Sequence, residues 1–207
     1  MNKQGNTYTF IYSIVLVVVV AAILAIVSLS LKPYQDENIE NEKRQNILSS
    51  VNVSSTPETS AELFNKIITK QFILNYKGEA IEGNAFAVDI PTEGKKLQKA
   101  MKNPELQKAL KDGKLLSETI KDDKALADVK FPVFVADIDG ATKYILPIYG
   151  AGLWGPIWGY ISLDDNKDTV YGTFFDHQGE TPGLGAEITT PEFNKEFRNK
   201  QIFSGNQ

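Results

Sequence analysis

The chain has 207 residues, of which 42% are hydrophobic and 23% are charged, so it is long and apolar enough for one folded domain with an ample core. It contains no Cys and one His, which excludes a disulfide framework, a thiolate metal site and a multi-histidine metal site. The formal net charge of -4 argues against a broad basic surface. No metal ion and no nucleic-acid partner are therefore expected.

The N-terminal region contains one long apolar segment, from Phe10 to Leu31, after a short tail at residues 1–9. The segment holds no charged residue, and as a helix it would extend about 33 Å, enough to cross a hydrocarbon core about 30 Å thick. The alternative is a cleaved signal peptide, whose apolar part is usually about 7 to 15 residues long. The longer segment here predicts one transmembrane helix at residues 10–31. The flanking Lys and Arg residues do not settle its orientation.

Residues 32–60 are predicted to connect this helix to a soluble domain, first as a stalk helix and then as a linker rich in Ser and Thr. The soluble domain is expected at residues 61–207. Its first helix is predicted at residues 60–71, because Thr59 and Glu62 have the spacing of a capping box.

The remainder of the soluble domain is predicted to combine further helices with a sheet. A lysine-rich helix at residues 95–111 is expected to break or kink near Pro104. From Val129 onward the apolar period changes towards two, which is typical of strands. Four consecutive strands are predicted, at residues 132–138, 142–149, 157–163 and 169–175. A final helix at residues 191–200, capped by Thr190, completes an α+β fold in which an antiparallel or mixed sheet has flanking helices.

Two glycine-rich loops follow predicted strands. The first, residues 150–159, places four glycines around Trp154 and Trp158, and the second, residues 177–187, combines three glycines with a proline. Such loops let backbone amides or a flat ring approach closely, and an exposed indole can stack on an aromatic ligand. Taken singly, each loop is also compatible with an ordinary turn or with a Trp packed in the core.

Taken together and in this order, the loops resemble the FMN-binding domain family, and within it the C subunits of the sodium-translocating NADH:quinone reductases. The resemblance extends over nearly the whole chain. The segments that carry it are Lys32-Pro33, Arg44-Gln45-Asn46-Ile47-Leu48, Pro147-Ile148-Tyr149-Gly150, Gly152-Leu153-Trp154 and Glu180 to Gly185. It implies an electron-transfer subunit that works through FMN among other membrane subunits, one of which oxidises NADH. It also implies the cell inner membrane, with a cytoplasmic N-terminus and a periplasmic large domain.

The resemblance places the FMN contacts in the two loops. The contact residues that it implies are Leu153, Trp154, Glu180, Thr181, Pro182, Gly183, Leu184 and Gly185. A flavin ring is planar and apolar on both faces, so Trp154 is expected to stack on it and Leu184 to pack against it. Amides around Thr181, Gly183 and Gly185 are expected at the polar edge of the ring.

The family joins FMN covalently, through its phosphate, to a threonine in a motif that none of residues 1–207 matches. Asp139-Gly140-Ala141-Thr142 has similar letters, but it lies in a predicted hairpin turn upstream of both loops. We therefore expect the threonine beyond residue 207 and a domain that is C-terminally incomplete in this sequence. The other explanation is a natural variant that cannot attach flavin.

Two other functions stay open on the sequence alone: the related flavin subunit of the Rnf electron-transport complex, and a flavin-free, membrane-anchored extracytoplasmic binding or scaffold domain. No stand-alone catalytic residue is identified. Asp164, Asn166 and Asp168 imitate the start of a calcium loop, but Thr169 stands where that loop needs glycine. No phosphate-binding glycine motif supports direct NADH binding. His177 is expected to be structural.

Overall fold

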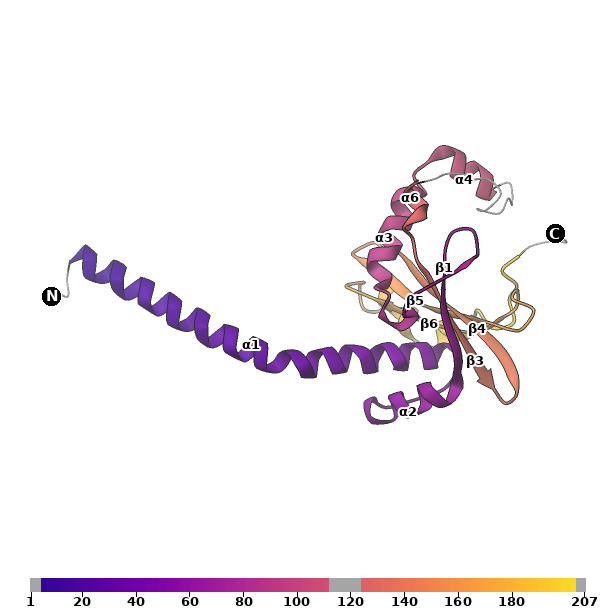
Figure 1. Cartoon of the computed structure of the whole chain (residues 1–207), viewed down its shortest axis with the longest axis horizontal. Helices are drawn as coiled ribbons and strands as arrows, with labels where there is room; N and C mark the ends of the chain where they lie inside the picture. The colour runs from indigo at the N-terminus through magenta and orange to yellow at the C-terminus, as the bar shows by residue number, and fades with distance from the viewer. Residues whose placement is uncertain (1–4, 112–123, 204–207) are drawn as a thin grey trace. The chain divides into compact units, whose positions relative to one another are not determined.

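The computed structural model describes residues 5–111 and 124–203, and the chain divides into two compact units, Met1–Lys43 and Arg44–Gln207. Figure 1 shows the N-terminal helix and the strands of the sheet, coloured in chain order. The first four residues of the predicted tail lie outside the described residues. The rest of that tail is already helical from Asn6 onward.

Helix α1 (Asn6–Ser50) contains the apolar segment that was predicted to cross the membrane. Its most apolar 18-residue window has a mean hydropathy of 3.2, and none of that window is buried in the protein. Among the described residues, α1 is the one helix long and apolar enough to span a membrane. Pro33 lies inside α1, so the predicted transmembrane and stalk helices form one element. A proline removes one backbone hydrogen bond and bends a helix without always ending it.

The second unit is built around a six-stranded sheet with the order β2-β1-β3-β4-β5-β6, in which every pairing is antiparallel. The strands are β1 (Ile68–Leu74), β2 (Ala80–Ile81), β3 (Phe131–Ile138), β4 (Ala141–Ala151), β5 (Pro156–Leu163) and β6 (Val170–His177). The last four confirm the predicted run of strands. Asp139 and Gly140 form the turn between β3 and β4, and both have the positive φ that such a turn requires.

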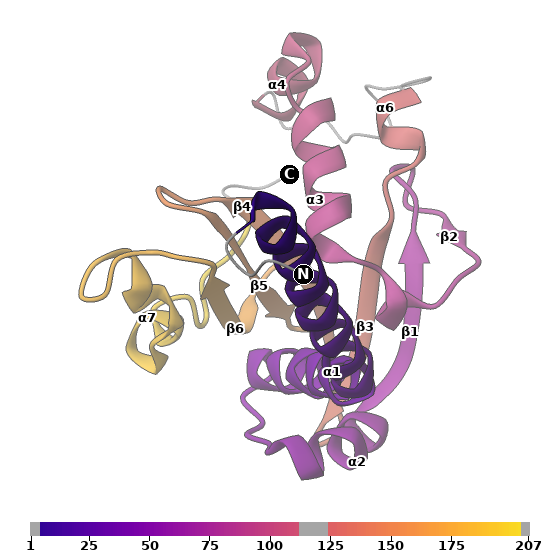
Figure 2. The same ribbon diagram turned by 90° about the vertical axis from the view of Figure 1, so that its left-hand side faces the viewer.

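Helices lie around this sheet. They are α2 (Pro57–Ile67), α3 (Ile90–Ala100), α4 (Pro104–Lys111), α6 (Lys124–Ala127) and α7 (Pro191–Lys195). The predicted lysine-rich helix is therefore two helices, with the break at the predicted Pro104. Figure 2 shows α3, α4 and α6 together at one end of the sheet and α7 beside β6. The predicted cap of the last helix is confirmed, because Thr190 Oγ1 accepts from the amide of Phe193 at 3.3 Å, but α7 ends at Lys195 and not at residue 200.

Helix α2 differs from the prediction of a helix at residues 60–71, because a different threonine caps it. Thr56 is the cap, and its amide donates to Oγ1 of Thr59 at 2.9 Å. The expected pairing of Thr59 with Glu62 is therefore wrong, and the helix starts and ends earlier along the chain. Hydrogen bonding from the Thr56 side chain also lowers the pKa of the Glu58 carboxyl in the first turn.

The main core lies between the sheet and the residues of α1 and α2 that pack against it. Ile47 and Leu48 of α1 are fully buried, as is Phe134 in β3. Phe64 of α2 lies edge-on to Phe134, with ring centroids 6.2 Å apart. The compact unit therefore begins at Arg44, inside the segment predicted as a stalk. Ile47, Leu48 and Val51 of that segment are core residues, whereas Ile39 is exposed.

A buried polar contact fastens the end of α1 to strands β5 and β6. Ser162 Oγ lies 2.5 Å from the carbonyl oxygen of Ser50 and 3.0 Å from that of Gly172, so its single proton can be donated to either. A Cβ at position 172 would come within 2.5 Å of the same Ser50 carbonyl. The close approach of helix and strand therefore requires glycine at 172 and a small hydroxyl side chain at 162.

Replacing Ser162 by alanine is expected to lower the free energy of unfolding by about 1–3 kcal/mol, since two buried carbonyl groups lose their shared donor. Chemical unfolding followed by tryptophan fluorescence measures the change. Ser54 is exposed, and Ser54→Ala is the matched control, with an expected change below about 0.5 kcal/mol. Equal effects of the two substitutions would contradict a role for the Ser162 hydroxyl in holding α1.

Candidate cofactor-binding loops

Two loops emerge at the same end of strands β4, β5 and β6. One, residues 152–155, joins β4 to β5, and the other, residues 178–184, leads from β6 into the short helix η2 (Gly185–Thr189). The strand register brings them together, because Ile157 pairs with His177 in the sheet. All eight predicted contact residues lie in these two loops or at the first residue of η2.

The carboxylate of Glu180 links the two loops. Its Oε1 accepts a hydrogen bond from the amide of Trp154 at 3.0 Å. It also occupies the space into which side chains at two glycines would project: a Cβ on Gly185 would lie 2.7 Å from Oε2, and a Cβ on Gly152 would overlap Oε1. Glu180 is itself held by its amide, which donates to Nδ1 of His177 at 3.2 Å. The one histidine thus has a structural contact, as expected.

Three large apolar side chains project from the linked loops into solvent. Leu153 is 82% exposed, Trp154 is 69% exposed and Leu184 is 74% exposed. A single exposed apolar residue is ordinary, but three on adjoining loops mark a surface that binds something. We call these three residues the apolar loop patch. Its exposure excludes the alternative in which Trp154 is a packed core residue.

Several backbone amides in and just after the second loop already donate hydrogen bonds to acceptors in the loop or in η2. The amide of Gly183, which has a φ of 73°, donates to Oε1 of Glu187 at 3.1 Å. The amides of Leu184 and Ala186 both donate to the carbonyl of Thr181, each at 3.1 Å. The Gly183 amide, expected at the polar edge of a ring, is therefore engaged by a carboxylate. Glu187 was not predicted to belong to the site, although a glutamate four residues after a loop glycine is a usable signal.

The residues of these loops fit a flavin. A flavin ring presents flat apolar faces, and the apolar loop patch offers apolar side chains on loops that two carboxylates already hold in place. Binding can cover the patch without first rearranging the loop backbones. No group of three or more metal-ligating side chains that could hold a metal ion occurs within residues 5–111 and 124–203.

Comparisons with known proteins place the same loops in a family. A family model described as the FMN-binding domain matches residues 152–206. The chain is 30% identical over 208 residues to the C subunit of the Na(+)-translocating NADH-quinone reductase of Pasteurella multocida, an alignment that covers 98% of this chain and 75% of that one. The solved structure of the C subunit from Parabacteroides distasonis is 42% identical, with a TM-score of 0.65 over 84% of this chain and 71% of that one. NqrC of Shewanella oneidensis, at 24% identity and a TM-score of 0.57 over 80% and 71%, has the same fold.

The sheet, its two linked loops and the matching family model define an FMN-binding domain that follows an apolar helix. Within that class, the chain belongs to the family of Na(+)-translocating NADH-quinone reductase C subunits. The resemblance seen in the sequence and the predicted α+β fold class are both confirmed.

Proposed function

We propose that this chain is the electron-transfer subunit of a sodium-translocating NADH:quinone reductase and that it holds FMN at the apolar loop patch. Family membership supports the electron-transfer function and the FMN cofactor. The observation that carries the placement of the cofactor is the Glu180 bridge, which joins the loops and leaves Leu153, Trp154 and Leu184 exposed beside it. The Rnf alternative gains no support from these relatives.

Each part of the loops has a separate task in this proposal. FMN supplies reversible one-electron chemistry when it is bound. Trp154 and Leu184 cover the ring faces and exclude water, which changes the relative stability of charged and neutral ring forms. Glu180 acts as a positioning residue, since its carboxylate bonds to the amide of Trp154 and fixes the indole relative to the second loop. Of the other predicted residues, Thr181, Pro182 and Gly183 set the path of that loop.

The proposal also covers the partners of this chain and its place in the membrane. Family membership makes the chain one member of an assembly of several subunits, and α1 fits a single membrane crossing. We further propose that the other membrane subunits of the reductase are its partners, that it does not bind NADH directly, and that it resides in the cell inner membrane. The N-terminus would be cytoplasmic and the sheet domain periplasmic.

Intact mass and in-gel flavin fluorescence of the denatured protein from its native membrane test the cofactor proposal. Covalent attachment of the FMN phosphate to a threonine is part of that proposal. It requires fluorescence in the denatured band and a mass that includes one FMN. A band without fluorescence, from protein that releases no flavin on denaturation, would instead support the flavin-free scaffold. Flavin released on denaturation would retain FMN but reject the covalent bond.

Trp154→Ala and Leu184→Ala are expected to shift the flavin midpoint potential by about 30–60 mV each, since about 59 mV corresponds to a tenfold change in preference between two one-electron states. Spectroelectrochemical titration measures the shift, and flavin fluorescence should rise when the indole is removed. Ile202→Ala is the control, because Ile202 is 45% exposed but is bonded to Asp168 at the opposite end of β6. Unchanged spectra and potentials in both loop variants would remove the patch from the flavin site.

A further inference from the structure

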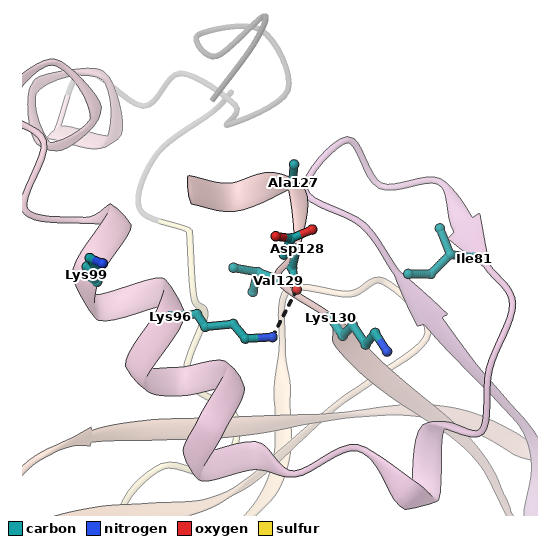
Figure 3. Close-up of a pocket in the computed structure, with 7 residues that line it drawn as sticks. All are labelled: Ile81, Lys96, Lys99, Ala127, Asp128, Val129 and Lys130. Atoms are coloured by element: carbon teal, nitrogen blue, oxygen red, sulfur yellow. Dashed lines mark hydrogen bonds between the residues drawn. The ribbon is translucent and has the colours of Figure 1, made fainter. Parts of the chain in front are cut away.

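A cavity of about 570 Å³ lies in another region of the domain, between α3, β2 and the segment that leads into β3. Figure 3 shows Lys96 reaching from α3 toward Asp128 across this cavity, with Lys130 beyond Val129. Three of the seven residues that line it are lysines: Lys96, Lys99 and Lys130. The FMN proposal uses none of them.

The lysines around this cavity are only partly neutralised. Nζ of Lys96 donates to Oε1 of Glu93 at 2.8 Å and to the carbonyl of Asp128 at 3.3 Å. The other carboxylate oxygen of Glu93 accepts the backbone amide of Lys130 at 2.9 Å. Among the lining residues, the side-chain charges of Lys99 and Lys130 are then opposed by the single carboxylate of Asp128. The lining therefore keeps a net positive charge.

The surrounding sequence reinforces this charge. The lobe that holds the cavity, described at residues 90–111 and 124–130, carries eight Lys against three Asp or Glu, a net charge of +5, whereas the whole chain has a net charge of -4. Among the described residues of this lobe, Lys102 and Lys108 are exposed, and neither of them lines the lysine-lined cavity or the apolar cavity beside it. An anionic ligand is therefore attracted to this lobe in preference to the rest of the domain.

A second, apolar cavity adjoins the first. It has a volume of about 290 Å³, lies between α3 and strands β3 and β4, and shares Val129 and Lys130 with the lysine-lined cavity. Its apolar lining includes Leu97 and Leu146. The two cavities together thus offer a basic site for a charged head and an apolar site for a tail, joined at the residues they share.

We propose that these adjoining cavities bind an anionic phospholipid of the membrane, with the phosphate at Lys99 and Lys130 and part of an acyl chain beside Leu97 and Leu146. Membrane lipid is the source that α1 brings into reach of this chain, and anionic headgroups attract clustered lysines. An acidic protein surface would satisfy the lysines but would leave the apolar cavity without an occupant. The combination of charge and apolar lining therefore favours an amphiphile over a protein partner.

Native mass spectrometry of the full chain in an uncharged detergent tests the proposal. The probes are lysophosphatidylglycerol, lysophosphatidylcholine of the same acyl length, and inorganic phosphate. Lysophosphatidylglycerol should bind most tightly of the three. The double substitution Lys99→Gln with Lys130→Gln should lower the affinity for lysophosphatidylglycerol by about 25-fold, because each basic residue near an anionic headgroup contributes roughly a factor of five. Lys102→Gln with Lys108→Gln removes the same charge outside both cavities and is the matched control.

Four other outcomes would each contradict the proposed phospholipid site. Equal affinity for the two lysolipids would exclude headgroup charge as the determinant, and equal affinity for inorganic phosphate would make the ligand a free anion. Equal weakening in the control variant would reduce the effect to the overall charge of the lobe. Loss of a neighbouring subunit from the reductase in the Lys99 and Lys130 variant, with lipid binding unchanged, would assign the lysines to a protein partner.

Discussion

Replacing Gly152 by alanine should separate the two loops and lower both FMN content and electron transfer. The added Cβ would overlap Oε1 of Glu180 and lie 2.8 Å from the carbonyl oxygen of Gly155. Overpacking of this kind costs about 1–3 kcal/mol, which corresponds to a loss of about 5- to 150-fold in the population with the loops joined. Flavin content and quinone-reducing activity of the assembled complex measure the effect.

The loop provides its own control for this substitution. A Cβ at Gly179 would meet nothing within 4 Å, so Gly179→Ala should leave flavin content and activity unchanged. Gly185→Ala should resemble Gly152→Ala, because its Cβ would lie 2.7 Å from the other carboxylate oxygen of Glu180. If Gly179→Ala proves as damaging as the other two, loop flexibility and not the Glu180 bridge is the property that matters.

Phe134→Ala is expected to lower the free energy of unfolding by about 3–5 kcal/mol, a large part of the stability of a typical domain. Phe134 is fully buried at the centre of the sheet and packs edge-on against Phe64. Removing its ring leaves a cavity between β3 and α2. Strand β3 cannot move to close this cavity without breaking its hydrogen bonds to the neighbouring strands. Urea titration of the purified protein, followed by circular dichroism, measures the loss.

An exposed phenylalanine separates the effect of burial from that of residue type. Phe203 is 60% exposed, and Phe203→Ala should change the free energy of unfolding by less than about 0.5 kcal/mol. A loss below about 1 kcal/mol for Phe134→Ala would mean that the core between β3 and α2 collapses around the missing ring. The packing of Phe64 would then be less constrained than the structure indicates.

The strands of this fold were predictable because their signals are local. Alternating apolar residues and the Asp139-Gly140 turn placed β3 to β6, and these strands are confirmed. Strands β1 and β2 were harder, since β1 pairs with β3 across intervening helices and no local pattern records so distant a partner. The cap of α2 was misplaced because Thr59 has the Glu three residues later that the capping-box pattern requires. The actual cap, Thr56, has Thr59 at that position, and the observed hydrogen bond identifies it.

The candidate site was predictable in position but not in construction. The glycines and aromatics of the two loops pointed to a cofactor, and the strand register places the loops side by side. The sequence did not reveal that Glu180 bonds across to Trp154, because the partners lie 26 positions apart along the chain. That contact depends on the tertiary arrangement of side chains, which propensity and periodicity do not record. The bond from Gly183 to Glu187 is local, and the four-residue spacing was a signal that the prediction did not use.

The burial of Ile47 and Leu48 matters for anyone who trims the membrane segment to obtain a soluble fragment. A cut in the Ser- and Thr-rich linker would look natural in the sequence, yet it would remove two fully buried side chains and the Ser50 carbonyl that Ser162 contacts. The exposed apolar groove left on the sheet would promote aggregation. A fragment that starts before Arg44 keeps the last turns of α1 as an internal lid on the core and avoids that defect.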